Sequence, residues 1–286
     1  MRYFQLFFFF LLLLLGRSVS AQLAKWIHPK SGNFYQINFE TQVLFENKDG
    51  IHWNKIADLR FEDIKSYDLI FGNLNYQEIL IPGSSLSYLT VSCTGQVYQL
   101  DRKNWVLKRV DQTFFRGANC LSIKFLRDNT LYSFGGYGFW QSSNVLTKYD
   151  SQKKEWMSVG VKGELPLAIN EGISVYIPSK DIFVTMANLQ VNDSRLNNNS
   201  VIDWNIYEYQ FKNNEFVKVG TIQLLELKKY LEKSTFRNSL FNGRYLILID
   251  KSTGSMITTI LLLTSYKCNR AGDRQVYKPG LFVTIN

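Results

Sequence analysis

The chain has 286 residues, with 33 Lys and Arg against 24 Asp and Glu, two His and three Cys. Its 45% content of apolar residues excludes a disordered chain, 18 Gly and 5 Pro exclude a collagen-like one, and three cysteines are too few for a disulfide scaffold. The length is enough for a large hydrophobic core in one or two domains.

The N-terminus has the pattern of a secretory signal peptide. Arg2 precedes an unbroken apolar run, Leu6–Leu15, and Val19–Ala21 is a small-residue cleavage sequence. The run is shorter than the roughly 18–20 residues that cross a bilayer. We therefore expect residues 1–21 to be removed, leaving a secreted or periplasmic protein with no stable membrane span. An uncleaved membrane anchor is the alternative.

The formal net charge of +9 becomes +7 once Arg2 and Arg17 leave with this segment, because each contributes +1. A positive surface is compatible with nucleic acid, an anionic membrane or an acidic glycan as partner. Export argues against nucleic acid, and the Lys and Arg residues are scattered with no run of five. We interpret the charge as a solvated surface and expect no nucleic-acid partner.

An aromatic–turn–aromatic pattern recurs along the chain. Three segments align without gaps, each with two aromatic residues seven positions apart around a polar stretch: Tyr98–Trp105, Tyr149–Trp156 and Tyr209–Phe216. A looser copy, Phe45–Trp53, has one extra residue, and the four closing aromatics are 52, 51 and 60 residues apart. Each copy predicts a β-hairpin whose second strand begins at the closing aromatic.

Further strands are predicted upstream of these hairpins. The apolar or alternating runs are 85–92, 120–126, 130–134, 172–177, 181–186 and 243–250. Four short strands per roughly 50 residues are typical of a β-propeller blade. The units close near residues 57, 110, 160 and 220, and a divergent last unit covers 235–286. The fold predicted is all-β, with residues 22–286 forming about five four-stranded blades.

The third unit resembles a kelch repeat. Leu131-Tyr-Ser-Phe-Gly135-Gly136-Tyr137 is followed by Tyr149 and Trp156, which is an apolar strand, a double glycine, an aromatic strand and a closing tryptophan. The double glycine ends the second strand, where a side chain would crowd the neighbouring blade. Other units keep the aromatic pair but have 91–95 and 184–188 in place of the glycines.

This resemblance covers about residues 30–250 and implies a kelch-type β-propeller of the galactose-oxidase/kelch-like superfamily. The family implies six or seven blades, which is more than this length provides. After residue 254 no aromatic–turn–aromatic hairpin follows, only the apolar run Met256–Leu263 and a basic polar stretch. Either the last blade is divergent, or the chain is incomplete.

One segment departs from the β pattern. Thr221–Ser234 carries apolar residues at 224, 227, 230 and 231, which is helical spacing. We expect a short amphipathic helix between the fourth and fifth units, packed on the side of the propeller. A lid or a partner-binding role is the alternative.

No motif for catalysis, a cofactor or a metal is present. His28 and His52 are the only histidines and both lie early, so the two-Tyr, two-His copper site of galactose oxidase is not expected. No phosphate-binding glycine loop and no G-x-S-x-G sequence occurs. Asp101 and Asp150 fall in hairpin turns, where we expect structural roles. The catalytic residues of any activity are therefore unknown, and no cofactor or metal is predicted.

Propellers bind ligands on the loops that ring one end of the axis. The residues proposed for this rim are Arg116, Tyr137, Phe139, Trp140 and Arg195. The aromatic side chains suit stacking on a sugar or anchoring a peptide, and an arginine suits a carboxylate. Arg195 lies in 188–200, which reads as a long polar loop. Packing of the aromatics between blades, and solvated arginines, are the alternatives.

The function predicted is an exported, non-catalytic binding module for a protein, a peptide or a glycan. An enzyme is the first alternative, because the chain is also similar in compartment and size class to exported kelch-type mutarotases that act on sialic acid. The second alternative is a sensor or scaffold fragment of a longer protein. Three cysteines, Cys93, Cys120 and Cys268, allow one disulfide and a free thiol, or three separate buried residues.

Overall fold

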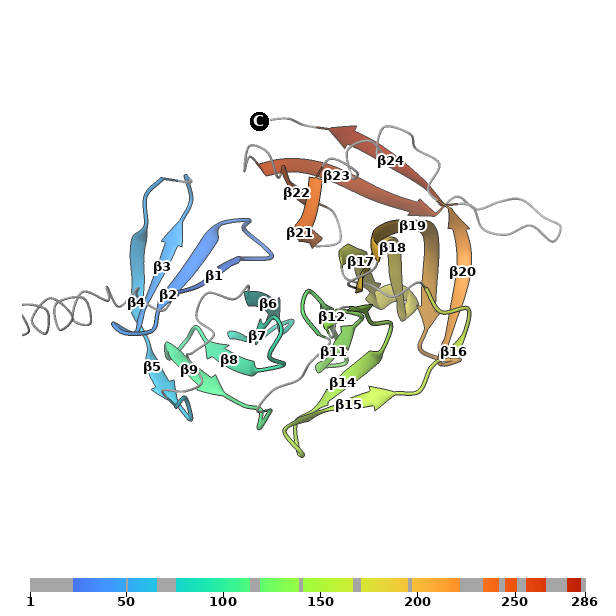
Figure 1. Ribbon diagram of the computed structural model, residues 1–286. Helices are drawn as coiled ribbons and strands as arrows, with labels where there is room; N and C mark the ends of the chain where they lie inside the picture. Colours follow the sequence, from blue (N-terminus) through green and yellow to red (C-terminus); the bar gives the residue numbers. More distant parts are fainter. Residues whose placement is uncertain are drawn as a thin grey trace, which may run out of the picture.

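The structure is a computed structural model. It describes residues 23–49, 51–65, 76–113, 119–138, 141–166, 171–194, 197–221, 234–241, 245–250, 256–265 and 277–283. In these residues the fold is all-β, with five largely antiparallel sheets and one 3-10 turn at Pro178–Lys180 (Figure 1). No helix in the described part of the chain is long and apolar enough to cross a membrane. The expected signal peptide and most of the expected helix at 221–234 lie outside the described residues.

The first two sheets are built from consecutive strands. Sheet 1 has the order β1 (Leu23–Ile27), β2 (Phe34–Asn38), β3 (Val43–Asn47) and β4 (Asn54–Asp58). Sheet 2 has the order β5 (Arg60–Glu62), β9 (Val106–Arg109), β8 (Val97–Asp101), β7 (Leu86–Val91) and β6 (Tyr76–Leu80). In each sheet the four consecutive strands form an antiparallel meander, and β5 is added in parallel beside β9.

The strands of the next two sheets interleave along the sequence. Sheet 3 has the order β10 (Ile123–Arg127), β11 (Thr130–Phe134), β14 (Leu146–Asp150) and β15 (Glu155–Val159). Sheet 4 is built on β17 (Glu171–Ile177), β18 (Ile182–Ser194), β19 (Asn197–Gln210) and β20 (Glu215–Thr221). Three short strands complete sheet 4: β12 (Tyr137–Gly138), β13 (Gln141–Ser142) and β16 (Lys162–Gly163).

Sheet 5 lies within the stretch predicted as the divergent last unit. Its order is β21 (Ser234–Phe241), β22 (Tyr245–Asp250), β23 (Met256–Ser265) and β24 (Tyr277–Val283). The apolar run that begins at Met256 is therefore a strand of a four-stranded antiparallel sheet.

Successive sheets pack face to face through apolar side chains. Trp26 and Leu44 of sheet 1 share a core with Leu100 of sheet 2. Sheets 2 and 3 meet around Ile79, Val97, Leu131 and Tyr149, and sheets 3 and 4 around Phe125, Phe134, Phe183 and Phe216. Burying one such side chain stabilises the fold by about 1.5–3 kcal/mol. The alternation of apolar residues in each strand thus serves two interfaces at once.

The first strands of the sheets contact one another in chain order. β1 contacts β6, β6 contacts β10, β10 contacts β17, and β17 contacts β21. In Figure 1 the five sheets follow one another around a common centre, with the first strands β1, β6, β17 and β21 on the inside. The fourth strands, such as β4 and β15, lie on the outside.

A repeated hydrogen bond joins each of the first three connections to the outer hairpin of the next sheet. The backbone pairs are Arg60 N to Trp105 O at 2.8 Å, Gln112 N to Lys154 O at 2.9 Å and Lys162 N to Asn214 O at 3.0 Å. Each acceptor is the last residue of a hairpin turn, and each has a left-handed backbone with φ of 53°, 56° and 55°. From two of these points the chain continues as the parallel strands β5 and β16.

Two of the predicted hairpins have the expected register. Tyr149 lies opposite Trp156, and Tyr209 lies opposite Phe216. In the second copy Tyr98 lies opposite Arg109, and the second strand begins at Val106, one residue after Trp105. Trp105 ends the turn instead of beginning a strand.

The cause of this shift is the residue that starts the turn. The Asp101 carboxylate accepts the backbone N–H groups of Lys103 and Asn104, so the turn begins directly after Asp101. Asp150 does the same for Gln152 and Lys153. Both aspartates therefore have the structural role expected. The Asn104 side chain and the Lys103 N–H hold the pKa of Asp101 below its ordinary value, and the backbone N–H groups that Asp150 accepts lower its pKa likewise.

The structure also corrects the prediction for the polar segment 188–200. It was predicted as an exposed loop, but the structure continues β18 to Ser194 and starts β19 at Asn197. The two arms pair from Asn188 opposite Asp203 out to Ser194 opposite Asn197. Backbone hydrogen bonds pair the two arms along this whole stretch, so the polar composition was a poor guide.

Candidate functional site

The meander topology gives the sheets two different ends. At one end the second strand passes to the third and the chain leaves for the next sheet, and we name it the connection end. At the other end lie the turns between the first two strands and between the last two, and we name it the turn end. The strands that flank the predicted rim residues finish at the connection end. Of those residues Tyr137 is described, whereas Arg116, Phe139, Trp140 and Arg195 lie outside the described residues.

Tyr137 is fixed by its backbone. It is paired with Cys120 in an isolated antiparallel bridge, in which the Tyr137 N–H donates to the Cys120 carbonyl at 2.7 Å. The Cys120 N–H donates back to the Tyr137 carbonyl at 3.0 Å. The segment after the double glycine is therefore held against the entry to sheet 3.

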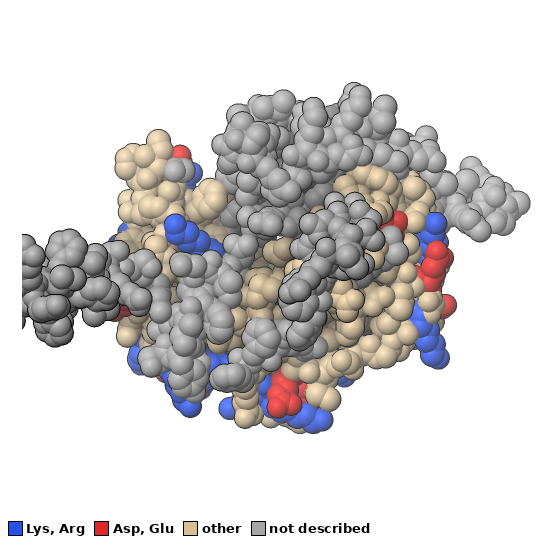
Figure 2. Space-filling view, in the orientation of Figure 1, with Lys and Arg blue, Asp and Glu red and all other residues tan. Residues whose placement is uncertain are grey.

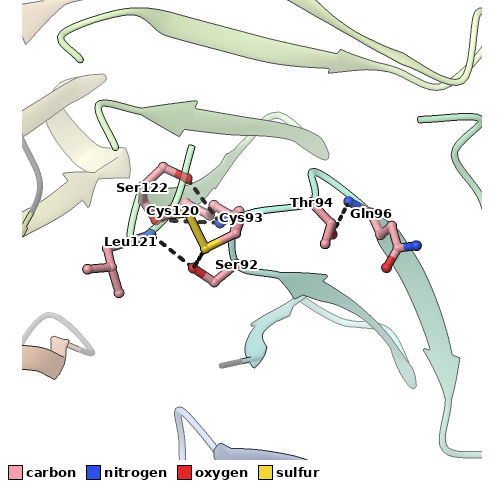
Figure 3. The surroundings of a disulfide bond; sticks show 8 residues. Ser92, Cys93, Thr94, Gln96, Cys120, Leu121 and Ser122 are labelled. Carbon is pink, nitrogen blue, oxygen red and sulfur yellow. Dashed lines mark hydrogen bonds between the residues drawn. A yellow bond between two sulfur atoms is a disulfide. The ribbon is translucent and has the colours of Figure 1, made fainter. Parts of the chain in front are cut away.

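A disulfide extends this link to sheet 2. Cys120 is bonded to Cys93, which lies in the β7–β8 connection, at a sequence separation of 27 (Figure 3). Beside it the Leu121 N–H donates to the Ser92 hydroxyl at 2.9 Å. Of the two possibilities left open for the cysteines, the structure has the disulfide, and Cys268 lies outside the described residues.

On its other side Tyr137 leads to sheet 4. β12 and β13 form a small hairpin, and Gln141 of β13 pairs with Asn192 of β18. A continuous path of covalent and hydrogen bonds thus crosses the connection end of sheets 2, 3 and 4. We name this path the strap, defined by Cys93, Cys120, Tyr137, Gln141 and Asn192.

The double glycine allows the sharp turn into the strap. Gly135 and Gly136 have φ of 70° and 114°, which is the region that favours glycine. The Gly135 N–H donates to the Val145 carbonyl, and the Gly136 carbonyl accepts the Ser143 N–H at 2.7 Å. Left-handed residues also occur near the end of the second strand in sheet 2, at Cys93, and within β18, at Ala187. Sheets 2 and 4 therefore have a left-handed residue at a comparable place although they lack the double glycine.

Lys124 is a buried amine just inside the connection end. It is the second residue of β10 and is 6% exposed. Its Nζ lies 3.1 Å from the Ser122 hydroxyl and 3.5 Å from the Ser122 carbonyl. Burial lowers the pKa of Lys124 to about 8, because removing the ammonium from water disfavours the charged form.

A second buried polar group lies in sheet 4. The Ser174 hydroxyl donates to Thr185 at 2.7 Å, and the Thr185 hydroxyl donates to the Asn188 carbonyl oxygen at 2.7 Å. Among the residues that the structure describes, the Asn188 amide nitrogen has no hydrogen-bond partner. Buried polar groups normally find partners, so this chain of groups is incomplete at its amide end.

At the turn end a buried carboxylate joins sheets 1 and 2. Glu78 accepts hydrogen bonds from the Trp26 indole at 2.9 Å, from the Ser87 hydroxyl at 2.6 Å and from the Arg102 guanidinium. Burial raises the pKa of Glu78, but the hydrogen bonds and the charge of Arg102 outweigh it, so the pKa lies below its ordinary value. The carboxylate is ionised and fully engaged.

Aromatic rings surround this pair. The Arg102 guanidinium lies 5.6 Å from the Tyr35 ring centroid, and Tyr35 stacks on Trp26 at 5.8 Å. The Tyr35 hydroxyl donates to Glu46 at 3.0 Å. Burial and this hydrogen bond raise the pKa of Tyr35 to about 12. Arg102 Nη2 is buried and has no hydrogen-bond partner among the described residues, whereas the Glu78 carboxylate and the Trp26 indole are hydrogen-bonded within the protein. We assign the cluster to holding sheets 1 and 2 together.

The repeat residues have the same kind of role. The Trp156 indole donates to the Gly95 carbonyl of sheet 2 at 2.7 Å, and the Tyr149 hydroxyl donates to the Val110 carbonyl. In sheet 4 the Tyr209 hydroxyl donates to Asn214, whose amide donates to the Gly160 carbonyl. Phe216 and Tyr98 are buried, and Trp105 packs against the core of sheets 1 and 2.

Among the described residues, neither the surface charges nor the possible metal ligands cluster into a further site. On the face shown in Figure 2, Lys and Arg lie in separate small groups near the perimeter, several of them beside Asp or Glu. His52 contacts Asp49 at 2.7 Å on an exposed turn, and His28 contacts Ser31. Within the described ranges no group of three or more His, Cys, Asp or Glu could hold a metal ion.

Sequence reasoning missed the buried charges Lys124 and Glu78 and the partly buried Arg102. The available signal was weak: Lys124 stands among apolar residues in 123–126, and Glu78 stands in 76–80, which also contains the polar Gln77. A charge at an inward position of an alternating strand indicates either a buried partner or a buried functional group. Arg102 lies in a polar turn, where nothing distinguishes it.

Comparison with known proteins adds little. No family model matches the sequence, and no curated protein matches it. One solved structure to which this chain is similar is that of YjhT, with 9% sequence identity and a TM-score of 0.48. The similarity covers 83% of this chain and 77% of that chain. At these values it carries no argument, so the function is argued from the residues.

Proposed function

We propose that the chain is an exported kelch-type β-propeller of five blades, which acts as a binding module for a protein, a peptide or a glycan. The five sheets would be the blades, and the succession of first strands β1, β6, β10, β17 and β21 would line the axis. The repeated bonds from each connection to the next outer hairpin support a ring, because they recur at the same place in three sheets.

The observation that carries this proposal is the strap. It fixes Tyr137 beside Cys120 at the end where the strands flanking the other proposed rim residues finish. A ligand site on loops needs such a rigid base, because loops alone do not hold side chains in place. The Cys93–Cys120 disulfide also supports export, since disulfides persist mainly in oxidising compartments.

Ligand binding would then depend on the connection end and not on the turn end. We expect Trp140→Ala to lower the affinity for a bound glycan or peptide by about tenfold or more, because a buried aromatic contact of this kind is worth roughly 2 kcal/mol. The matched control is Trp53→Ala, which removes a 39% exposed tryptophan at the turn end of sheet 1.

The experiment is binding of the purified protein to glycan and peptide arrays, followed by calorimetric titration of any hit with both variants. Loss of affinity in Trp140→Ala alone supports the proposal. Equal loss in Trp53→Ala, or no effect of Trp140→Ala, overturns the assignment of the rim. Accelerated anomerisation of a sugar by the wild-type protein would favour the isomerase alternative over a non-catalytic module.

A further inference from the structure

The disulfide of the strap lies between two connecting segments and not within a sheet (Figure 3). Cys93 belongs to the β7–β8 connection of sheet 2, and Cys120 precedes β10 of sheet 3. Both cysteines are half-buried, and so are their neighbours Ser92 and Leu121. These four residues therefore have surface in contact with solvent, from which a reductant approaches.

Other contacts also hold sheets 2 and 3 together. The Gln77 side-chain amide donates to the Lys124 carbonyl at 3.3 Å, and the Trp156 indole donates to the Gly95 carbonyl at 2.7 Å. The two sheets also share a core of Ile79, Val97, Leu131 and Tyr149. We therefore expect the sheets to stay packed when the disulfide opens.

The two ends of the disulfide are held differently. The connection that carries Cys93 is tied into sheet 2, because the Val91 N–H donates to the Gln96 carbonyl at 3.1 Å. Cys120 lies outside the strands of sheet 3 and forms an isolated bridge with Tyr137. Opening the disulfide therefore frees the segment around Cys120, together with Tyr137, while Cys93 keeps its place in sheet 2.

The backbone on both sides of the disulfide is left-handed. Cys93 has φ of 70° and Leu121 has φ of 60°, and neither is a glycine. A side chain disfavours this conformation, so it persists where the surrounding structure imposes it. Without the cross-link both residues can relax. The segment around Cys120 thus has two arrangements, one held by the disulfide and one released.

We propose that the Cys93–Cys120 disulfide is a reversible redox latch, which a dithiol reductant opens in the folded protein to release residues 119–122 and Tyr137 from sheet 2. A thiolate of the dithiol attacks one sulfur, forms a mixed disulfide and displaces the other cysteine as a thiolate. The second thiol of the reductant then closes its own disulfide and frees the first cysteine. Two electrons pass from the dithiol to the protein, and its two protons end on the two cysteine thiols.

The latch would control the base of the proposed rim. Reduction removes the covalent link between Tyr137 and sheet 2, so a ligand held at the connection end should bind more weakly to the reduced protein. That consequence rests on the proposed function. The latch itself does not, because its release is measured without a ligand.

The test is amide hydrogen exchange of the wild type, read by peptide mass spectrometry in reduced and in oxidised dithiothreitol. We expect the amides of 119–122 and Tyr137 to exchange at least about tenfold faster after reduction and to recover when the disulfide re-forms. The amides of 34–47, in sheet 1, should change less than about twofold. A second arm uses reduced thioredoxin: release there assigns the reductant to a protein dithiol, and release by dithiothreitol alone assigns it to a small one.

The double variant Cys93→Ala, Cys120→Ala gives the released state without a reductant. We expect fast exchange at 119–122 in both conditions, while Cys268→Ser behaves as the wild type. Measurements on the wild type decide the matter even if the double variant does not fold. A disulfide that dithiothreitol leaves intact in the folded protein would overturn the proposal, and so would opening with unchanged exchange at 119–122. Equal acceleration at 119–122 and 34–47 would also overturn it, because a purely structural disulfide predicts that result.

Discussion

The indole N–H of Trp26 donates to the carboxylate of Glu78 at 2.9 Å, across the boundary between sheets 1 and 2. The same carboxylate accepts from Ser87 within sheet 2 and from Arg102 of the outer hairpin. One buried side chain thus ties the inner strands of two sheets to the turn at their edge. Because each sheet buries its faces only against its neighbours, ties of this kind decide whether the sheets behave as one unit.

Removing this carboxylate should destabilise the protein strongly. Glu78→Ala leaves the Arg102 charge and the Trp26 N–H without their partner, and breaking a buried ion pair costs about 3–5 kcal/mol. Chemical unfolding followed by tryptophan fluorescence measures the loss. Glu62→Ala removes a partly exposed carboxylate and should cost roughly 1 kcal/mol or less. Equal losses in the two variants would refute the role given to Glu78.

The Glu78 contribution should depend on pH in a defined direction. Its pKa in the folded protein lies below the ordinary value of 4.5, so its contribution is fully present above about pH 4.5 and is lost as the pH falls further. We therefore expect the stability difference between the wild type and Glu78→Gln to shrink on acidification below that value. A difference that stays constant down to the acid unfolding range would contradict this assignment.

The strap should contribute to stability through its disulfide. Closing a loop with a sequence separation of 27 is worth about 3–4 kcal/mol of unfolded-state entropy. Reduction of the wild type, or Cys93→Ser, should lower the free energy of unfolding by that amount. Cys268→Ser serves as the control, since it should retain the sensitivity to reduction. A reduction-insensitive wild type would show that the bond does not form in solution.

Gly163 should tolerate no side chain. It has φ of +87°, and a Cβ would lie 2.2 Å from the Phe216 carbonyl oxygen in the β16–β20 pair. Gly83 has φ of +71° but open space around it, so Gly83→Ala isolates the backbone strain, about 1 kcal/mol. Gly163→Ala should cost at least about twice as much, measured by thermal unfolding. Similar costs would mean that β16 is not packed against β20.

Much of the β structure was predictable because the spacing of two aromatic residues indicates where a hairpin turns. Tyr149 and Trp156 occupy facing positions, and their spacing alone indicates this. The same spacing misplaced Tyr98 and Trp105, because the turn there is set by Asp101 and not by the aromatics. The polar composition of 188–200 wrongly predicted a loop, because the pairing of β18 with β19 in this stretch is made by backbone hydrogen bonds.

The candidate site was less predictable because its groups come together only in three dimensions. Pairing of Cys93 with Cys120 cannot be read from three cysteines, since any two could join. The burial of Lys124 depends on the contacts of β10 with two other sheets. Residues near a motif, such as Tyr137, were found because the double glycine marks the end of a strand.

The central proposal is that the five sheets form one cooperative unit. Differential scanning calorimetry of residues 22–286, with monomer mass checked by sedimentation, tests it most directly when Glu78→Ala and Gly163→Ala are compared with the wild type. A ring predicts a single transition that both variants shift as a whole, although they lie in different sheets. Two transitions, of which each variant shifts only one, would contradict the account.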